Sequence, residues 1–210
     1  MIDKLKNAGY IQVGVDDSAD ISIINTCTVT NNADSKSRKI INQAIKKNKD
    51  AIIIVCGCLV QNKQEDIDGV DIIIGNVGKS KIVDYIEDYK KKNDKIKDIK
   101  DIMNTPFEPM VLNNFNKTRA FVKIQDGCNN FCAFCVIPYS RGNVRSKKRE
   151  DVLKEVNNLV LKGHKEIVLT GIHTGNYGAE FNNYKLSNLI EELIQIDGLE
   201  RITISSIEMN

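Results

Sequence analysis

Long hydrophobic runs are missing from this sequence. Its longest apolar stretches, AIIIV at 51–55 and VDIIIG at 70–75, are far shorter than the roughly 20 residues that cross a bilayer. The N-terminal residues also lack the basic and then apolar order of a secretory signal peptide. We therefore expect no membrane partner.

An excess of charge of one sign is missing as well. The 30 Lys and Arg residues nearly balance the 28 Asp and Glu residues, which leaves a net charge of +2. The overall charge therefore neither demands nor excludes a nucleic-acid partner. Six cysteines occur without a secretory signal. In a reducing cytosol, clustered cysteines bind metal or do chemistry more often than they form disulfides. The sequence therefore predicts a cytoplasmic protein. We also expect it to be a monomer.

Strand and helix patterns alternate over residues 1–90. The first segment, MIDKLKNAGYIQV, is predicted to form a helix and then a strand. The apolar run ISIINT, an amphipathic segment at 34–48 and the run AIIIV come next, and VDIIIG and a helix from Lys79 repeat the alternation. Strands that alternate with helices indicate a parallel sheet, so this part is predicted to be a small doubly wound α/β domain.

A stretch rich in Lys and Asp follows at 91–117 and is predicted to be a linker. From 118 to 210 the alternation resumes as strand, cysteine-rich loop, helix, strand, helix and strand, with the regular elements at 119–124, 147–162, 166–170, 186–196 and 201–206. Three strands are too few for a barrel, so this domain is expected to be the first part of a partial (β/α) barrel. Both ends of the chain look shortened, as in a gene fragment.

The cysteine-rich loop, QDGCNNFCAFCVIPYSRG at 125–142, carries the strongest chemical signal. Cys128, Cys132 and Cys135 follow the spacing C-x3-C-x2-C. Structural zinc needs four ligands, and no fourth Cys or His lies nearby in the sequence. Three thiolates instead fit a 4Fe-4S cluster with one iron left unligated.

An open iron suits chelation by a substrate or cofactor, as S-adenosylmethionine does in radical enzymes. The spacing therefore favours catalysis, with an incomplete zinc site or coincidental buried cysteines as the alternatives. Phe134 lies between two of the cysteines. It is expected either to form an apolar wall for an adenine ring or to shield the cluster.

The other cysteines lie near the ends of predicted strands in the first domain, at the sheet edge where ligands bind in doubly wound folds. Cys27 and Cys58 are the better ligand pair, because strand alternation is expected to turn Cys56 to the opposite side, into the core. The residues alone leave open whether this is a second metal site or a set of buried cysteines.

Together, NTCTVT, the GC of VCGCL and KIQDGCNNFCAFCVIPYSRG resemble the radical S-adenosylmethionine methylthiotransferase family. NNADSKSR and LTGIHTGNYG at 169–178 are most similar to the tRNA N6-threonylcarbamoyladenosine methylthiotransferases, and the resemblance covers essentially all 210 residues. It implies a radical 4Fe-4S cluster on Cys128, Cys132 and Cys135. It also implies a second, auxiliary 4Fe-4S cluster on Cys27 and Cys58, whose third cysteine would precede Met1 and is absent, as are the later barrel strands and an RNA-binding domain.

The activity that the resemblance implies is transfer of a methylthio group to adenine C2 of N6-threonylcarbamoyladenosine beside the tRNA anticodon. An electron donor such as a flavodoxin or ferredoxin would reduce the radical cluster, which would cleave S-adenosylmethionine to a 5′-deoxyadenosyl radical that takes the hydrogen from C2. The auxiliary cluster would supply sulfur, which carries a methyl group from a second S-adenosylmethionine. The implied partner is the anticodon arm of tRNA.

The turn TGIHTGNYG supplies candidates for cofactor binding. Because it follows a predicted strand beside the radical motif, Thr170, Gly171 and His173 are expected to line the pocket for the amino acid end of S-adenosylmethionine. His173 is equally readable as a loop histidine that hydrogen-bonds within its own turn.

The stretch RGNVRSKKR concentrates five cations beside the cysteine loop: Arg141, Arg145, Lys147, Lys148 and Arg149. They are expected to contact phosphates of the anticodon arm. The alternative is that they solvate the first turn of a helix capped by Ser146.

Other functions remain open at this point. Within the family, the substrate could be isopentenyladenosine in tRNA or a ribosomal protein. From a different class, the chain could be a non-catalytic iron-sulfur or zinc RNA-binding module.

Overall fold

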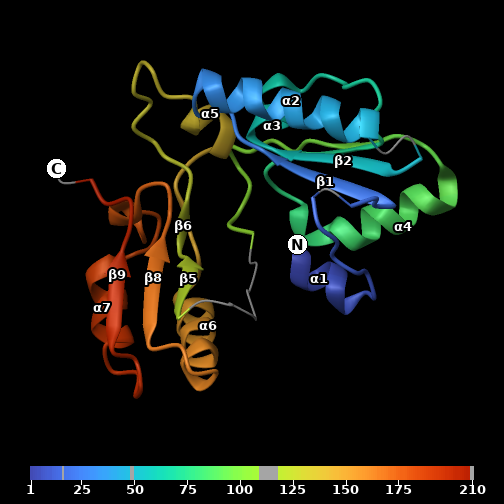
Figure 1. The fold of residues 1–210 in the computed structure, drawn as a ribbon. Helices are drawn as coiled ribbons and strands as arrows, with labels where there is room; N and C mark the ends of the chain where they lie inside the picture. Colours follow the sequence, from blue (N-terminus) through green and yellow to red (C-terminus); the bar gives the residue numbers. More distant parts are fainter. Residues whose placement is uncertain (16, 48–49, 109–117, 209–210) are drawn as a thin grey trace. The chain divides into compact units, whose positions relative to one another are not determined.

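The computed structural model describes residues 1–15, 17–47, 50–108 and 118–208 (Figure 1). The chain forms two compact units. The first unit comprises Met1–Thr105 and Cys132–Arg141, and the second comprises Pro106–Phe131 and Gly142–Asn210. The first unit is therefore discontinuous in sequence, since a piece of the cysteine loop belongs to it.

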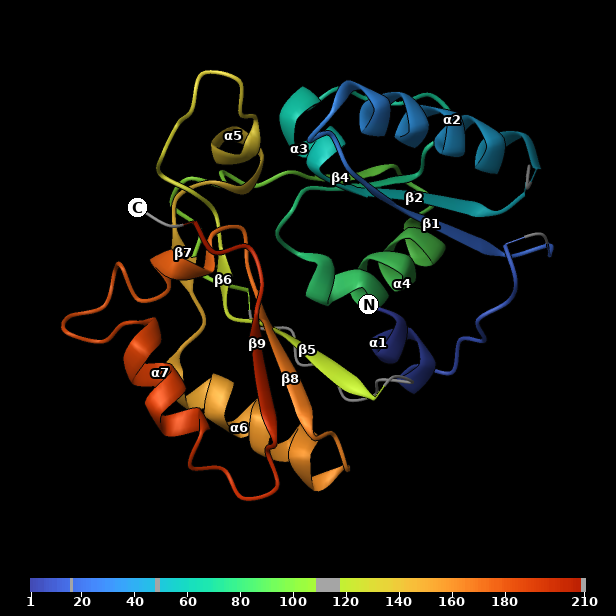
Figure 2. The same cartoon turned by 60° about the vertical axis from the view of Figure 1, so that its left-hand side comes forward.

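The first unit is built on a four-stranded parallel sheet in the order β1-β2-β3-β4. Its strands are β1 (Ile21–Thr26), β2 (Ile52–Gly57), β3 (Ile72–Ile74) and β4 (Ile96–Asp98). Its helices are α1 (Ile2–Asn7), α2 (Asn31–Lys47), α3 (Cys58–Lys63), the 3-10 turn η1 (Lys79–Lys81), α4 (Ile82–Lys92) and α5 (Ile137–Arg141). Figures 1 and 2 show α2 and α3 on one face of the sheet and α1 and α4 on the other. The predicted doubly wound α/β arrangement is confirmed.

Both faces of this sheet are apolar because helices cover both. Ile53 and Val55 pack with Ile41 of α2 on one face. Ile54 and Cys56, one residue out of phase with them, pack with residues of α4 on the other face. The continuous run at 51–55 thus follows from burial on both sides of a central strand.

The second unit holds a three-stranded parallel sheet in the order β5-β8-β9 and a small antiparallel pair, β6-β7. Its strands are β5 (Arg119–Lys123), β6 (Gln125–Asp126), β7 (Arg145–Ser146), β8 (Glu166–Thr170) and β9 (Arg201–Ile204). Its helices are α6 (Arg149–Leu161), the 3-10 turn η2 (Thr174–Asn176) and α7 (Leu186–Leu193). Both α-helices lie on the same face of the sheet (Figure 2). Their apolar sides share one core with the strands, formed around Val122, Val156, Ile167 and Leu189.

Three details differ from the sequence prediction. No strand forms at 10–13, where the side chain of Ile11 is 88% exposed, because the segment is not hydrogen-bonded to the sheet. Residues 96–98, expected to lie in a linker, form β4, while 109–117 of that segment lie outside the described residues. Helix α6 begins at Arg149 with Lys148 as its N-cap, so Ser146 is in β7 and does not cap it.

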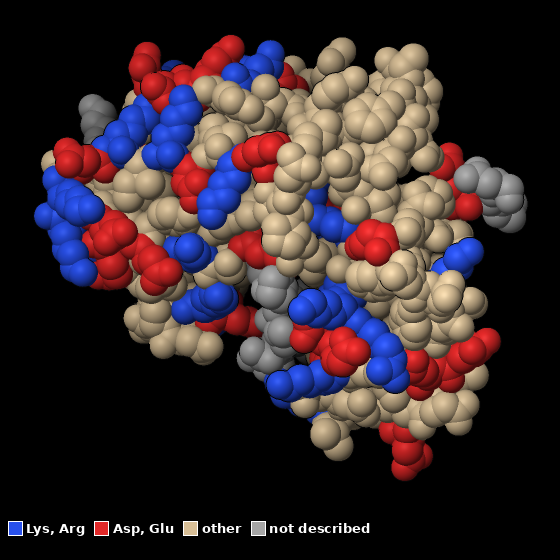
Figure 3. All heavy atoms as spheres, turned by 180° about the vertical axis from the view of Figure 1, so that it is seen from behind, with Lys and Arg blue, Asp and Glu red and all other residues tan. Residues whose placement is uncertain are grey.

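Within the described residues, no helix is both long enough and apolar enough to span a membrane. On the face drawn in Figure 3, Lys and Arg side chains lie among Asp and Glu side chains. This mixture agrees with the small net charge of +2.

Candidate functional site

The cysteine loop is closed at its base by hydrogen bonds between its two ends. The N–H of Cys128 donates to the carbonyl of Gly142 at 3.0 Å, and the N–H of Val144 donates to Oδ1 of Asn129 at 2.9 Å. Gly127 precedes them with φ +75°, and a Cβ there would collide with the carbonyl of Asn143. A glycine is needed at this position both for its conformation and for the close approach of the returning chain.

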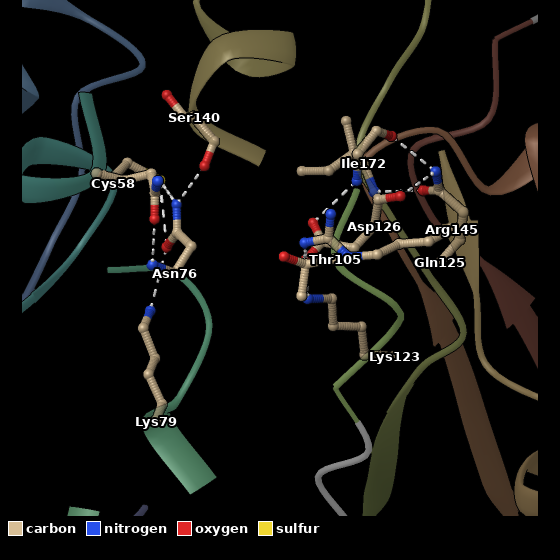
Figure 4. Close-up of polar contacts among 12 residues, drawn as sticks. Cys58, Asn76, Lys79, Thr105, Lys123, Gln125, Asp126, Ser140, Arg145 and Ile172 are labelled. Atoms are coloured by element: carbon tan, nitrogen blue, oxygen red, sulfur yellow. Dashed lines mark hydrogen bonds and ion pairs between the residues drawn. The ribbon is translucent and has the colours of Figure 1, made fainter. Parts of the chain in front are cut away.

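Gln125 connects this base to the turn after β8 (Figure 4). Its side chain is fully buried, and its Oε1 accepts the N–H groups of Ile172 and His173, each at 2.9 Å. Its Nε2 donates to the carbonyls of Asp126 at 3.0 Å and Gly127 at 2.7 Å. One side chain therefore hydrogen-bonds to both segments that are expected to hold the cluster and its cofactor.

Asp126 is a buried carboxylate beside Gln125. Its Oδ2 lies 2.6 Å from Nζ of Lys123 and 3.1 Å from a terminal nitrogen of Arg145, while its Oδ1 accepts the N–H of Gly127 at 3.0 Å. Figure 4 shows Arg145 reaching this carboxylate from the opposite strand of the pair. The buried guanidinium of Arg145 is therefore neutralised by Asp126 within the second unit, since a buried ion requires a partner of opposite charge.

The predicted cationic patch is not one exposed surface. Arg145 is 7% exposed, and Lys147 is 1% exposed with its ammonium paired to Glu155. Arg149 is exposed but forms hydrogen bonds to Glu192, which raise the pKa of Arg149. The prediction is wrong for Arg145 and Lys147, because partners contributed by other elements take up their charges. Arg141 is half-buried and Lys148 is exposed.

The three cysteines of the loop are free thiols. Cys132 is exposed, and Cys128 and Cys135 are half-buried. Cys128 belongs to the second unit, and Cys132 and Cys135 belong to the first. Among the described residues, no three His, Cys, Asp or Glu side chains lie close enough to hold one metal ion. The donors still match a 4Fe-4S cluster with an open iron in kind and number, since three free thiols share one accessible loop.

Phe134 does not shield these thiols in the structure. Its side chain is 94% exposed. In this arrangement of the loop the ring therefore covers none of the three thiols. Both expected roles, as a shield for a bound cluster and as a wall for an adenine ring, stay predictions.

The turn expected to bind the cofactor follows β8 directly. Thr170 and Gly171 are half-buried, and a Cβ on Gly171 would come within 2.8 Å of Oε1 of Gln125. His173 is 6% exposed, its Nε2 lies 3.6 Å from Oε2 of Glu208, and its buried Nδ1 has no hydrogen-bond partner among the described residues. The structure therefore gives His173 no side-chain hydrogen bond within its own turn there.

The cysteines of the first unit lie near the carboxyl ends of two adjacent strands. Cys27 follows β1 and is exposed, whereas Cys58 opens α3 and is 1% exposed. Nδ2 of Asn76 lies 3.4 Å from Sγ of Cys58 and 2.6 Å from the carbonyl of Ser140, and Lys79 donates to Oδ1 of Asn76 at 3.3 Å (Figure 4). Asn76 thus holds Cys58 within a polar network.

Cys56 is fully buried in the core, as predicted, and desolvation raises the pKa of its thiol. Strand alternation does not separate Cys56 from Cys58, because two residues at i and i+2 of a strand point to the same face. The chain instead leaves β2 at Gly57, with φ +110°, and Cys58 is already helical.

Sequence reasoning missed two polar residues that organise these sites, Gln125 and Asn76. Neither belongs to a periodic pattern or to a spacing typical of ligands. The one available signal is position, because each lies within two residues of a glycine where the chain leaves a strand region. Their roles depend on partners distant in sequence.

Two family matches cover most of the chain. Residues 1–78 match the family described as "Uncharacterized protein family UPF0004", and residues 122–210 match the "Radical SAM superfamily". The solved structure of TsrM from Kitasatospora setae, a radical S-adenosylmethionine methyltransferase with cobalamin and a [4Fe-4S] cluster bound, is similar with a TM-score of 0.52 and 14% identity. That match covers 84% of this chain and 41% of the TsrM chain, and at this identity it shows the fold alone.

Curated relatives match almost the whole chain. The "Threonylcarbamoyladenosine tRNA methylthiotransferase MtaB" of Bacillus subtilis (strain 168) is 45% identical over 97% of this chain and 46% of its own length. The protein of the same name from Aquifex aeolicus (strain VF5) is 41% identical over 99% of this chain and 52% of its own length. A "tRNA-2-methylthio-N(6)-dimethylallyladenosine synthase" of Clostridium botulinum is 36% identical over 94% of this chain and 46% of its own length.

The chain spans about half the length of these curated relatives. The two family matches lie in the same order as the two alternating α/β regions predicted from the sequence. The chain therefore combines a UPF0004 domain with a radical SAM domain, and over nearly its whole length it is similar to curated tRNA methylthiotransferases.

Proposed function

We propose that this protein takes part in transfer of a methylthio group to C2 of N6-threonylcarbamoyladenosine beside the tRNA anticodon. The observation that carries the proposal is 45% identity over 97% of the chain to a threonylcarbamoyladenosine tRNA methylthiotransferase. The three-cysteine loop lies within the region matched to the radical SAM superfamily. An intracellular location and tRNA as the partner belong to the same proposal.

Cys128, Cys132 and Cys135 are the proposed ligands of a 4Fe-4S cluster whose open iron takes S-adenosylmethionine. When bound, such a cluster supplies the electron for reductive cleavage of that cofactor. The chain's own contribution is to fix Cys128 through the Gly142 carbonyl and to present the turn at Thr170 and Gly171. A flavodoxin or ferredoxin is the proposed electron donor.

Cys27 and Cys58 are the proposed ligands of a second cluster. They lie just after the carboxyl ends of β1 and β2, which are paired neighbours. Two thiols do not complete a cluster site, and the third free thiol nearby in sequence, Cys56, is fully buried in the core. We therefore assign no chemical step to this pair.

Contact with the anticodon arm is proposed for the three cations of this stretch that are at least partly exposed to solvent. Lys148 and Arg149 are exposed, and Arg141 is half-buried. Phosphate contacts of this kind are independent of sequence and weaken as salt rises. Arg145 and Lys147 are left out of this proposal because both are buried.

The test is anaerobic reconstitution of the chain with iron and sulfide, followed by iron and zinc analysis and by a cleavage assay with S-adenosylmethionine and a chemical reductant. We expect bound iron and formation of 5′-deoxyadenosine. Zinc in place of iron, or no cleavage, would contradict the radical assignment and favour a non-catalytic RNA-binding module.

The substrate is tested separately. tRNA from cells that lack the endogenous methylthiotransferases would be incubated with the reconstituted protein, digested and examined by mass spectrometry. We expect the methylthio product on N6-threonylcarbamoyladenosine. Product only on the dimethylallyladenosine nucleoside would favour the second candidate substrate, which the 36% identity to the Clostridium botulinum synthase supports.

A further inference from the structure

We propose that Gln125 is a positioning residue that couples the radical-cluster loop to the turn that receives S-adenosylmethionine. The inference rests on the function proposed above and adds a residue that binds neither iron nor cofactor. Its basis is the set of four hydrogen bonds made by one fully buried side chain.

The partners of Gln125 divide into two groups. On one side are the carbonyls of Asp126 and Gly127, which immediately precede Cys128. On the other side are the N–H groups of Ile172 and His173, in the turn after β8. A shift of either group of backbone atoms therefore changes the hydrogen bonds of the other.

The chemistry of the site requires an amide. Two backbone donors face one end of the side chain and two backbone acceptors face the other, so the orientation of the amide is fixed by its surroundings. A carboxylate could accept the two N–H groups but could not donate to the two carbonyls. An apolar side chain would remove all four of these hydrogen bonds from the interior.

Close packing makes the coupling tight. A Cβ on Gly171 would lie 2.8 Å from Oε1 and 3.0 Å from Cβ of Gln125, so the turn approaches the glutamine as closely as a glycine permits. Buried side chains in such contact move together because interiors hold few voids. Gly171 therefore keeps the turn against Gln125.

A second connection between the cysteine loop and the turn passes through Glu208. Nδ2 of Asn130 donates to Oε2 of Glu208 at 3.3 Å, and Nε2 of His173 lies 3.6 Å from the same oxygen. Glu208 is exposed, with its side chain 61% accessible. This exposed contact is weaker than the buried one, so the coupling depends mainly on Gln125.

The test compares Gln125→Glu and Gln125→Ala with the wild-type chain. Gln125→Glu keeps the acceptor for Ile172 and His173 and loses the donor for the loop, whereas Gln125→Ala loses both. Tyr177→Phe is the matched control. It removes one buried hydrogen bond in the same unit, from the tyrosine hydroxyl to the carbonyl of Lys147 at 2.9 Å, and does not involve Gln125.

The first measurement is amide hydrogen exchange in the metal-free chain. Gln125→Ala should speed exchange at Cys128, Ile172 and His173 together, whereas Gln125→Glu should speed it at Cys128 and leave the two turn amides protected. Tyr177→Phe should leave all three close to wild type. Unchanged protection in Gln125→Ala would overturn the coupling, and this result does not depend on any bound cofactor.

The second measurement uses the reconstituted chain. Iron content should stay near wild type in Gln125→Glu, while the concentration of S-adenosylmethionine needed to change the electron paramagnetic resonance signal of the reduced cluster should rise roughly 10- to 100-fold. A role confined to stability would lower iron content and leave that concentration unchanged, which would overturn the proposal. If wild type itself takes up no iron, the proposed function fails, and the exchange measurement alone decides the coupling.

Discussion

The two cysteine-bearing regions of this chain are held in place by different physical means. Cys56 lies near the end of a central strand, where buried isoleucines and valines fix the backbone. The base of the cysteine loop, residues 124–128 and 142–147, depends on buried polar groups instead. Gln125, Asp126 and Arg145 are paired there by hydrogen bonds and ionic contacts.

This difference determines how each region responds to change. Apolar burial is non-directional and roughly proportional to area, so a strand end tolerates small shifts. A buried polar network is worth most when every group has its partner, and loses most when one is removed. We therefore expect the loop base to be the more sensitive of the two regions, and four experiments test this comparison.

The largest expected effect separates Cys128 from Cys56. Cys128→Ala removes a proposed cluster ligand, so reconstituted iron should fall sharply and reductive cleavage of S-adenosylmethionine should be abolished. Cys56→Ala, in the apolar core, should leave iron content almost unchanged. Metal analysis and product chromatography measure both. Persistent cleavage in purified Cys128→Ala would remove that cysteine from the cluster.

Lys147→Met should cause the largest loss of stability at the loop base. The ammonium of Lys147 is buried against Glu155, and removal of one partner of a buried ion pair costs about 3–5 kcal/mol. Urea denaturation monitored by circular dichroism measures the loss. The double variant Lys147→Met with Glu155→Leu should recover most of it, because no unpaired charge is left. If the single variant were as stable as wild type, the loop base would not be the more sensitive of the two regions.

Gly127→Ala should destabilise the loop base by more than the roughly 1–2 kcal/mol that a left-handed conformation costs. Its φ is +75° and its new Cβ would collide with the carbonyl of Asn143. Gly163→Ala is a matched control, since φ there is +93° with nothing within 4 Å of the new Cβ. Equal losses of unfolding free energy in the two variants would mean that the collision relaxes without cost.

The smallest effect concerns thiol reactivity in the metal-free, reduced chain. Burial raises the pKa of the Cys56 thiol, so less of it is thiolate at pH 8, and the side chain is inaccessible. Iodoacetamide should label exposed Cys132 roughly tenfold faster or more, as measured by peptide mass spectrometry. The labelling rate of Cys56 should rise when the pH exceeds the ordinary pKa of a cysteine thiol. Unfolding in urea should reduce the difference in labelling rate between Cys132 and Cys56. Equal rates in the folded chain would contradict the burial of Cys56.

The regular elements could be predicted from the sequence where apolar residues carry them. The predicted runs at 21–26, 51–55 and 166–170 correspond to β1, to β2 at Ile52–Gly57 and to β8. β4 at 96–98 was missed because its three residues lie among Lys and Asp with no alternation, and its strand character comes from pairing with β3. Short edge strands of this kind are decided by the sheet and not by local pattern.

The sequence predicts which residue types serve as ligands at the candidate site. It predicts much less about which side chains are buried or paired there. The spacing of Cys128, Cys132 and Cys135 indicates a cluster because thiolates at that spacing have few other uses. The burial of Lys147 could not be predicted, since its ion pair with Glu155 of α6 forms only in the folded chain. A run of cations in sequence says nothing about which of them find carboxylates in the fold.

The discontinuous first unit has a consequence for how the chain is made. Its sheet is complete once Asp98 has been synthesised, but Asn76 and Asn62 also bond to Ser140 of α5. A ribosome that adds about 5–20 residues per second must first make the cysteine loop before those bonds can form. Until α5 has been synthesised, the sheet of the first unit lacks the hydrogen bonds that join Asn76 and Asn62 to Ser140. A translation pause between the end of the sheet and α5 would lengthen that interval.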